Sequence, residues 1–205
     1  MRDPENIGGI LESQPDYLGL IFHEKSPRFV GKEPDEGIIK ALQKYPSKTG
    51  VFVNKSVAEV LQTADVWGLN AIQLHGQESP AYCLEIKKTG KTILKAFSIS
   101  EKFDFDTLQA YSGCCDYFLF DTKGKLPGGT GKKFNWVLLE KYTMNTPFFL
   151  SGGISPEDIE DIRDFKHPQL AGLDINSGFE TGPAMKDVEK AKEFIRLIRN
   201  MNDTL

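Results

Sequence analysis

Ala71-Ile72-Gln73-Leu74-His75-Gly76-Gln77-Glu78-Ser79-Pro80 passes from a short β-rich run, through a polar turn, to the start of a helix. Ser79 suits a helix cap, Pro80 suits the first helical position, and the helical periodicity that follows continues through Ile86. A strand followed at once by a helix is half of a βαβ unit, which places neighbouring strands parallel. This stretch therefore predicts a parallel sheet covered by helices.

The same unit recurs along the chain at a spacing of about 20–30 residues. Other β-rich runs, which are nearly continuous in apolar residues, occupy positions 17–22, 48–53, 92–97, 117–120, 147–150 and 171–175. Further segments with helical periodicity occupy positions 56–61, 135–139, 155–162 and 187–198. Continuous apolar runs are typical of strands that are buried on both faces. We count about seven strands against about eight helices, a number close to the eight units of a closed barrel.

The series opens with a helix rather than with a strand. Asp3 is a good N-cap, Pro4 fits the first helical position, and Glu5 favours the positive end of a helix. We therefore expect residues 1–205 to form one α/β domain, a compact (β/α)8 TIM barrel whose first β-strand is missing from this chain. Such a sheet would have two unpaired edges, which invite pairing with another chain, so we expect a monomer or a homodimer.

An open, doubly wound sheet is the structural alternative. Two glycine-rich motifs of nucleotide-binding folds bear on it, and this sequence matches neither. No glycine-rich fingerprint follows the first strand, which argues against a dinucleotide-binding fold. Gly128-Gly129-Thr130-Gly131-Lys132 resembles a P-loop, but the spacing of its glycines before the lysine does not match that motif.

Composition excludes several classes of function. The 205 residues carry a net charge of −4 with scattered cations, which gives no electrostatic support for binding nucleic acid. No apolar run approaches the roughly 18 residues that cross a bilayer, and the polar N-terminus shows no signal peptide. The three cysteines, at positions 83, 114 and 115, make a poor disulfide framework. We expect a cytoplasmic protein that does not associate with membranes.

Polar residues at the ends of predicted strands are the candidates for chemistry, because barrel enzymes place their sites at the carboxyl ends of strands. Asp121 ends the run Tyr117–Phe120, and a partly desolvated carboxylate there suits a general acid. A helix cap or a solvated loop aspartate is the alternative reading. Ser151-Gly152-Gly153 and Asn176-Ser177-Gly178 follow the last two strands, where barrels commonly bind phosphate through backbone N–H groups.

Arg28, His75 and the three cysteines could also take part in chemistry, but each has a simpler structural explanation. Arg28 could grip a carboxylate with both arms of its guanidinium, although a surface arginine is the commoner case. Histidine titrates near neutrality, but we expect His75, which follows Gln73-Leu74, to fix a loop by a hydrogen bond. The histidines and cysteines show no metal-ligand spacing, so we expect no metal. Cys83, Cys114 and Cys115 are read as buried structural thiols.

Nine short stretches together resemble one family, phosphoribosylanthranilate isomerase of tryptophan biosynthesis, along nearly the whole chain. They are Pro15-Asp16-Tyr17-Leu18-Gly19, residues 22–29 with Lys25-Ser26-Pro27-Arg28, Gly50-Val51-Phe52-Val53-Asn54, Gln73-Leu74-His75-Gly76-Gln77-Glu78-Ser79, Phe120-Asp121-Thr122, Gly128-Gly129-Thr130-Gly131, Leu150-Ser151-Gly152-Gly153-Ile154, Asp174-Ile175-Asn176-Ser177-Gly178-Phe179-Glu180 and Lys186-Asp187. Any one of them is weak, and their common order makes the resemblance strong.

The resemblance implies an Amadori rearrangement that interconverts an aldose and a ketose without a metal or an organic cofactor. The small-molecule phosphoribosyl substrate, N-(5-phosphoribosyl)anthranilate, becomes 1-(2-carboxyphenylamino)-1-deoxy-D-ribulose 5-phosphate. Asp121 would protonate the furanose ring oxygen, and a cysteine would then remove the C2 proton. Arg28 would face the anthranilate carboxylate, and Gln73, His75 and Asp174 would bind or order the substrate. The phosphate loops match Gly152, Gly153, Ser177 and Gly178.

This chain departs from the family pattern at its start. The family's cysteine lies in a Lys-(Ile/Val)-Cys-Gly-(Met/Ile) strand directly before an Arg-Asp-Pro-Glu-Asn-Ile helix, and Met1 aligns with the last residue of that strand. We therefore expect the general base to be absent here and activity to be impaired by about 10²–10⁴-fold. The alternative is a non-catalytic phosphosugar-binding or assembly subunit. Another phosphosugar isomerase or epimerase is a third reading. A smaller departure is Asn135, where the family usually has aspartate.

Overall fold

A computed structural model describes residues 1–43, 45, 47–122 and 135–202. Its main sheet contains seven strands, β1 Leu18–Ile21, β2 Lys48–Phe52, β3 Ala71–Leu74, β4 Thr92–Ile99, β5 Tyr117–Thr122, β6 Phe148–Leu150 and β7 Leu170–Leu173. All neighbouring pairs are parallel, and their spatial order follows the chain from β1 to β7. Sequential order excludes the doubly wound alternative, whose strand order reverses at a switch point.

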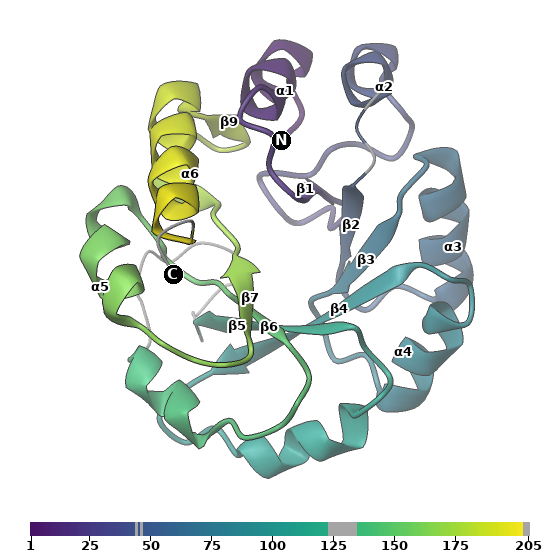
Figure 1. Cartoon of the computed structure of the whole chain (residues 1–205). Helices are drawn as coiled ribbons and strands as arrows, with labels where there is room; N and C mark the ends of the chain where they lie inside the picture. Colours follow the sequence, from purple (N-terminus) through teal and green to yellow (C-terminus); the bar gives the residue numbers. More distant parts are fainter. Residues whose placement is uncertain (44, 46, 123–134, 203–205) are drawn as a thin grey trace.

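Helices cover the outer face of this sheet, which curls round a central hollow (Figure 1). The α-helices are α1 Pro4–Leu11, α2 Glu36–Leu42, α3 Val57–Val66, α4 Pro80–Lys87, α5 Ile159–Asp164 and α6 Val188–Asn202. The 3₁₀ helices are η1 Phe105–Tyr111, η2 Trp136–Lys141, η3 Pro156–Asp158 and η4 Ser177–Phe179. A small antiparallel pair, β8 Glu180–Gly182 with β9 Met185–Lys186, follows η4. None of the helices in the described part of the chain has the length and apolarity needed to cross a bilayer.

The helix starts follow from their caps. Asp3 accepts a hydrogen bond from the Asn6 amide, and Ser56 forms a full capping box with Glu59. Asn135 caps η2 by accepting from the Val137 amide, so the departure from the family's aspartate keeps the cap. The helices α2 and η1 were not predicted. The sequence Gly128-Gly129-Thr130-Gly131-Lys132 lies outside the described residues.

The core lies between the sheet and its helices. In β5, Phe118 and Phe120 are fully buried on the helix-facing side, whereas Leu119 and Asp121 line the hollow. This alternation is the period of two of a β-strand, and it places a strand-end carboxylate on the inner face. Phe148 of β6 packs against Phe120 in a tilted arrangement with ring centroids 4.9 Å apart, which joins neighbouring strands on the outer face.

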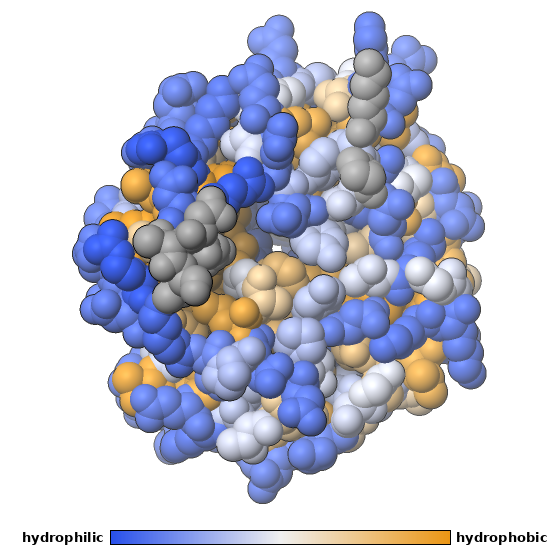
Figure 2. Space-filling model, viewed as in Figure 1, coloured by the Kyte–Doolittle hydropathy of each residue, from blue (hydrophilic) through white to orange (hydrophobic). Residues whose placement is uncertain are grey.

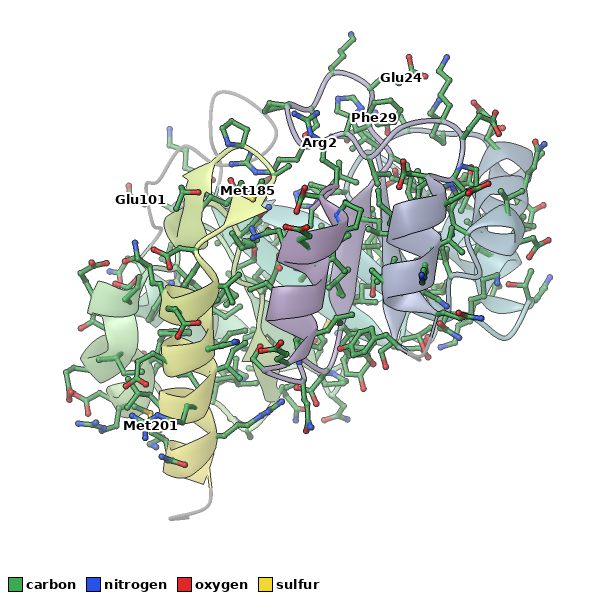
Figure 3. All side chains as sticks on the ribbon, turned by 90° about the horizontal axis from the view of Figure 1, so that it is seen from above. Arg2, Glu24, Phe29, Glu101, Met185 and Met201 are labelled. Atoms are coloured by element: carbon green, nitrogen blue, oxygen red, sulfur yellow. The ribbon has the colours of Figure 1, made fainter. Side chains whose placement is uncertain are left out.

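The sheet is open between β1 and β7, which are its two edges within the described residues. The helical layer, in contrast, is continuous there. The Asn6 side chain of α1 exchanges two hydrogen bonds of 2.8 Å with the Lys186 backbone of β9, and Lys192 of α6 binds Glu12 at 2.7 Å. Figures 1 and 3 show α1 and α6 as neighbours across the gap. The fold is thus a curled, parallel α/β half-barrel.

Candidate active site

A cavity of about 750 Å³ occupies the hollow of the sheet, and its lining runs from residues ahead of the strands, such as Asp16 and Ser47, to the strand ends, where His75 and Asp121 lie. Figure 3 shows this end of the molecule by the labelled residues Glu24, Phe29 and Met185, with Met201 at the opposite end. Figure 2 views the molecule from that opposite end, where the strands begin, and shows apolar residues inside the hollow and hydrophilic residues around it. At the strand ends and in the loops after them, the polar lining of the cavity includes Gln73, His75, Asp121, Ser151, Gly152, Gly153, Asp174 and Ser177.

Asp121 and His75 meet in this cavity. The backbone of Asp121 is still in the β4–β5 ladder opposite Ser98, and the His75 amide donates to the Phe52 carbonyl at 2.8 Å, so both residues have a fixed backbone. His75 Nε2 lies 3.2 Å from Asp121 Oδ2. The Gln73 amide nitrogen lies 3.0 Å from His75 Nδ1. His75 therefore makes hydrogen bonds to side chains of β3 and β5, one of which is the candidate general acid, whereas its role in fixing a loop stays a prediction.

The direction of these hydrogen bonds follows from the chemistry of the donors. With the Gln73 amide nitrogen placed toward His75 Nδ1, Nδ1 accepts, and the imidazole proton is assigned to Nε2. Nε2–H then donates to the Asp121 carboxylate. The side chains of His75 and Asp121 are 21% and 18% exposed, so both are accessible from the cavity although most of their surface is buried. An ordered carboxylate at a cavity mouth can exchange a proton with a bound molecule.

Asp174 is a second carboxylate in the cavity, just beyond β7. Ser151 Oγ donates to its Oδ2 at 2.9 Å. Desolvation raises the pKa of Asp174, the Ser151 hydrogen bond offsets part of that rise, and the negative charge of Asp121 adds to it. Asp174 therefore holds its proton to a higher pH than an ordinary aspartate.

Asp174→Asn is expected to stabilise this chain at neutral pH. Because the pKa of Asp174 is raised in the folded state, the unfolded chain releases this proton first, and folding stability falls as pH rises above the ordinary value of 3.8. Below that pH both states hold the proton, and the variant should match the parent. Urea unfolding across this pH range measures the difference. Asp16→Asn, at a side chain 89% exposed, is the control; equal pH profiles for parent and Asp174→Asn would contradict the prediction.

The two glycine loops lie side by side at the ends of β6 and β7. Gly152 and Gly153 adopt φ angles of +91° and +73°, which are ordinary only for glycine. A Cβ on Gly178 would lie 2.3 Å from the Ile154 backbone oxygen, so only glycine lets the loops approach this closely. Gly152, Gly153 and Ser177 line the cavity, whereas Gly178 faces the other loop.

Gly178→Ala is expected to push these loops apart and to destabilise the chain by about 1–3 kcal/mol. The clash is with backbone, which cannot turn away as a side chain can. Binding of inorganic phosphate, measured by calorimetry, should weaken in parallel. Gly182→Ala is the matched control, because a Cβ there meets nothing within 4 Å. Equal stability and phosphate affinity in the two variants would show that the close approach is unimportant.

Arg28 is held by an acidic partner. Its Nε and Nη2 donate to both carboxylate oxygens of Glu180 at 2.6–3.0 Å. Arg28 is 9% exposed. Lys186 binds the same carboxylate at 3.0 Å and Asn176 Oδ1 at 2.5 Å. The role of Arg28 toward a substrate carboxylate stays a prediction, because the guanidinium contacts Glu180 in this structure.

Arg28, Glu180 and Lys186 form a charged cluster in which each member affects the ionisation of its neighbours. Burial opposes ionisation of Glu180, but the hydrogen bond from Arg28 and the charge of Lys186 outweigh it and lower the pKa of Glu180. Burial lowers the pKa of Lys186, and Glu180 opposes that fall. Lys186 also lines the cavity, so it is a cation that the candidate set did not include. Its signal was present in the Lys186-Asp187 motif.

The cysteines lie away from this cavity lining. Cys115 is buried as expected, and Cys83 is buried within α4, but Cys114 is only half-buried, because it lies in the turn before β5. Within the described ranges, no group of three or more histidine, cysteine or acidic side chains has the geometry to hold a metal ion.

A curled parallel sheet with a polar cavity at its strand ends defines a half-barrel α/β protein of the kind that binds small molecules at that end. Residues 1–197 match the family described as N-(5'-phosphoribosyl)anthranilate (PRA) isomerase, and the chain belongs to that family. N-(5'-phosphoribosyl)anthranilate isomerase of Parabacteroides distasonis is 46% identical over 199 residues, which cover 97% of this chain and 90% of that protein.

Solved structures agree with this assignment. The crystal structure of phosphoribosyl anthranilate isomerase from Thermotoga maritima has a TM-score of 0.83 and 30% identity, and covers 98% of this chain and 96% of that chain. A phosphoribosyl anthranilate isomerase in complex with reduced 1-(o-carboxyphenylamino)-1-deoxyribulose 5-phosphate has a TM-score of 0.80 and 28% identity, with 98% and 95% coverage.

Proposed function

We propose that this chain acts on N-(5-phosphoribosyl)anthranilate and carries the machinery for its Amadori rearrangement to 1-(2-carboxyphenylamino)-1-deoxy-D-ribulose 5-phosphate. The single observation that carries the proposal is the ordered Asp121 carboxylate, 3.2 Å from His75 Nε2, at the mouth of the cavity. Family membership and a relative's complex with a reduced form of that product support the choice of substrate.

In the proposed reaction, the proton of Asp121 goes to the furanose ring oxygen. The C1–O bond breaks, the ring opens, and the anthranilate nitrogen forms a Schiff base with C1. A base then takes the C2 proton, which gives an enolamine. Protonation at C1 and loss of the C2 hydroxyl proton give the ketone and return the proton that Asp121 donated. Substrate and product are isomers, so the proposal requires no redox partner. Asp174 and Gln73 would order the sugar, and His75 would orient the acid.

The two ends of the substrate have different partners in this proposal. Gly152, Gly153, Ser177 and Gly178 form the phosphate site, since their loops pack together beside the cavity. Arg28 would meet the anthranilate carboxylate, with Glu180 holding the guanidinium in place from the other side. Lys186, which binds Glu180 and lines the cavity, adds positive charge there.

We also propose that the gap between β1 and β7 fits one further parallel strand and completes an eight-stranded barrel. Support comes from the helical layer, which already spans the gap through α1 and α6. The part of the cavity between these elements is apolar and includes Ile10, Leu18, Phe194, Ile195 and Ile198. In the family pattern this strand brings the cysteine base. The oligomeric state, monomer or homodimer, stays a prediction.

The test is loss of phosphoribosylanthranilate fluorescence with the purified chain, beside a version extended by Lys-Val-Cys-Gly. Turnover by the extended version alone supports both proposals. Full activity of the short chain would mean that another group is the base and that the proposed mechanism is wrong. If neither reacts while reduced product still binds, the non-catalytic phosphosugar-binding alternative replaces this proposal.

A further inference from the structure

Lys95 is a buried cation that the proposed reaction does not use. It lies in β4, is 2% exposed, and follows Leu94, which lines the cavity. Because side chains alternate along a strand, Lys95 points to the opposite face of the sheet, toward the layer that contains α4. An ammonium group in such a place is costly unless it is paired and hydrogen-bonded. Its partners therefore indicate what it is retained to hold.

The partners of Lys95 are concentrated on the turn that carries His75. Lys95 Nζ donates to the carbonyls of Leu74 and Gly76, the residues on either side of His75, at 3.2 and 2.9 Å. It also donates to its neighbour Ala96 at 3.0 Å and lies 3.2 Å from Glu78 Oε2. Lys95 therefore binds the backbone carbonyls of the residues immediately before and immediately after His75.

Glu78, which lies in the same turn, also binds its backbone. Its Oε2 accepts from the Gly76 amide and its Oε1 accepts from the Asn54 amide, both at 2.9 Å. Both Lys95 and Glu78 side chains are 2% exposed, so the pair is shielded from water and salt. Asn54 in turn binds the Gln77 amide at 2.6 Å, which ties the loop after β2 to the turn after β3.

We propose that Lys95 and Glu78 are positioning residues, which fix the His75 turn so that the imidazole Nε2–H points at Asp121. The link is short, since the carbonyls that Lys95 binds flank His75 directly. The imidazole is then held at Nδ1 by Gln73 and at Nε2 by Asp121. The effect on catalysis rests on the proposed function, whereas the effect on the imidazole does not.

The test uses Glu78→Gln/Lys95→Met, which removes both charges and leaves neither one buried alone. Two-bond ¹H–¹⁵N correlations distinguish a protonated from an unprotonated ring nitrogen, and His75→Asn assigns the His75 signals among the three histidines. The parent should show protonated Nε2 and bare Nδ1. The double variant should lose this single tautomer, and in the Lys-Val-Cys-Gly extended version its kcat should fall on the order of 10- to 100-fold with little change in KM.

Two further variants separate positioning from general stability. Lys87→Met breaks a half-buried ion pair with Asp116 at 2.9 Å, and it should leave the His75 signals and kcat unchanged. Gly76→Ala changes no charge, but its Cβ would lie 2.3 Å from Asn54 Oδ1, so it should disturb the same turn and the same His75 signals. It also decides the matter if the double variant does not fold.

The proposal is overturned if either folded turn variant keeps the single His75 tautomer. A lost tautomer with unchanged kcat would overturn the catalytic part alone. If the extended parent has no activity, the proposed function fails, and the ring-nitrogen signals still decide whether Lys95 and Glu78 position His75.

Discussion

With Lys-Val-Cys-Gly added ahead of Met1, we expect phosphoribosylanthranilate to be converted about 10²–10⁴ times faster than by the 205-residue chain. Met1 lines the cavity, and the charges of Lys186, Glu180 and Arg28 act on its amino group, so residues added before it begin beside that charged cluster. The added strand should bring a thiol to the side of the substrate that Asp121 does not serve. Steady-state kinetics by fluorescence loss gives the ratio directly.

An extension with Lys-Val-Ser-Gly separates the strand from the thiol. Both extensions can pair with the edges of β1 and β7, so both should raise the melting temperature of the chain. Only the cysteine version should gain activity. If the serine version is equally active, the gain comes from completing the sheet and the thiol is not the base. If neither extension alters stability, the gap does not accept a strand.

Asp121→Asn in the cysteine-extended chain is expected to lower kcat by about 10²–10⁴-fold. Asparagine keeps the shape of the side chain and can still accept the His75 Nε2–H, but it has no acidic proton for the ring oxygen. The loss should therefore fall on kcat, with KM little changed, because the phosphate loops and the rest of the cavity are untouched.

A chemically opened analogue provides the control for that variant. Reduced product, which contains no furanose ring, should bind Asp121→Asn and its parent with similar affinity in calorimetry. Asp116 lies directly before β5 and outside the cavity lining, so Asp116→Asn should retain full activity. An Asp121→Asn enzyme with more than about a tenth of parental kcat would show that the acid is another group.

The strands could be predicted because they are short apolar runs with polar ends. All seven predicted runs form strands, although β4 continues to Ile99 and β5 includes Asp121 and Thr122. Helices with a clear start signal, such as the one capped by Ser56, were also predicted, but α2 and η1 were missed. The caps of both, Asp35 and Asp104, are present in the sequence. What was lacking is a long apolar stripe behind them.

The site was predictable only where the chemistry coincides with a strand end. Asp121, Asp174 and His75 follow apolar runs, so their convergence on one cavity could be expected from the parallel sheet. The salt bridge between Arg28 and Glu180 joins residues 152 positions apart, and no local sequence pattern predicts it. Lys95 was missed for a related reason, because a lysine inside an apolar run looks like a surface residue until its carbonyl partners are known.

The hydrogen-bonded pair between Asn6 and Lys186 also bears on how the molecule folds. It joins residues 180 positions apart, so its formation requires nearly the whole chain to be in place. Contacts of such sequence separation carry the largest loop-closure entropy and slow the folding of proteins that depend on them. The half-barrel should therefore assemble progressively from β2 to β6, with the α1–α6 contact forming last and opening first. Amide exchange should be fastest at this junction and slowest in the middle strands.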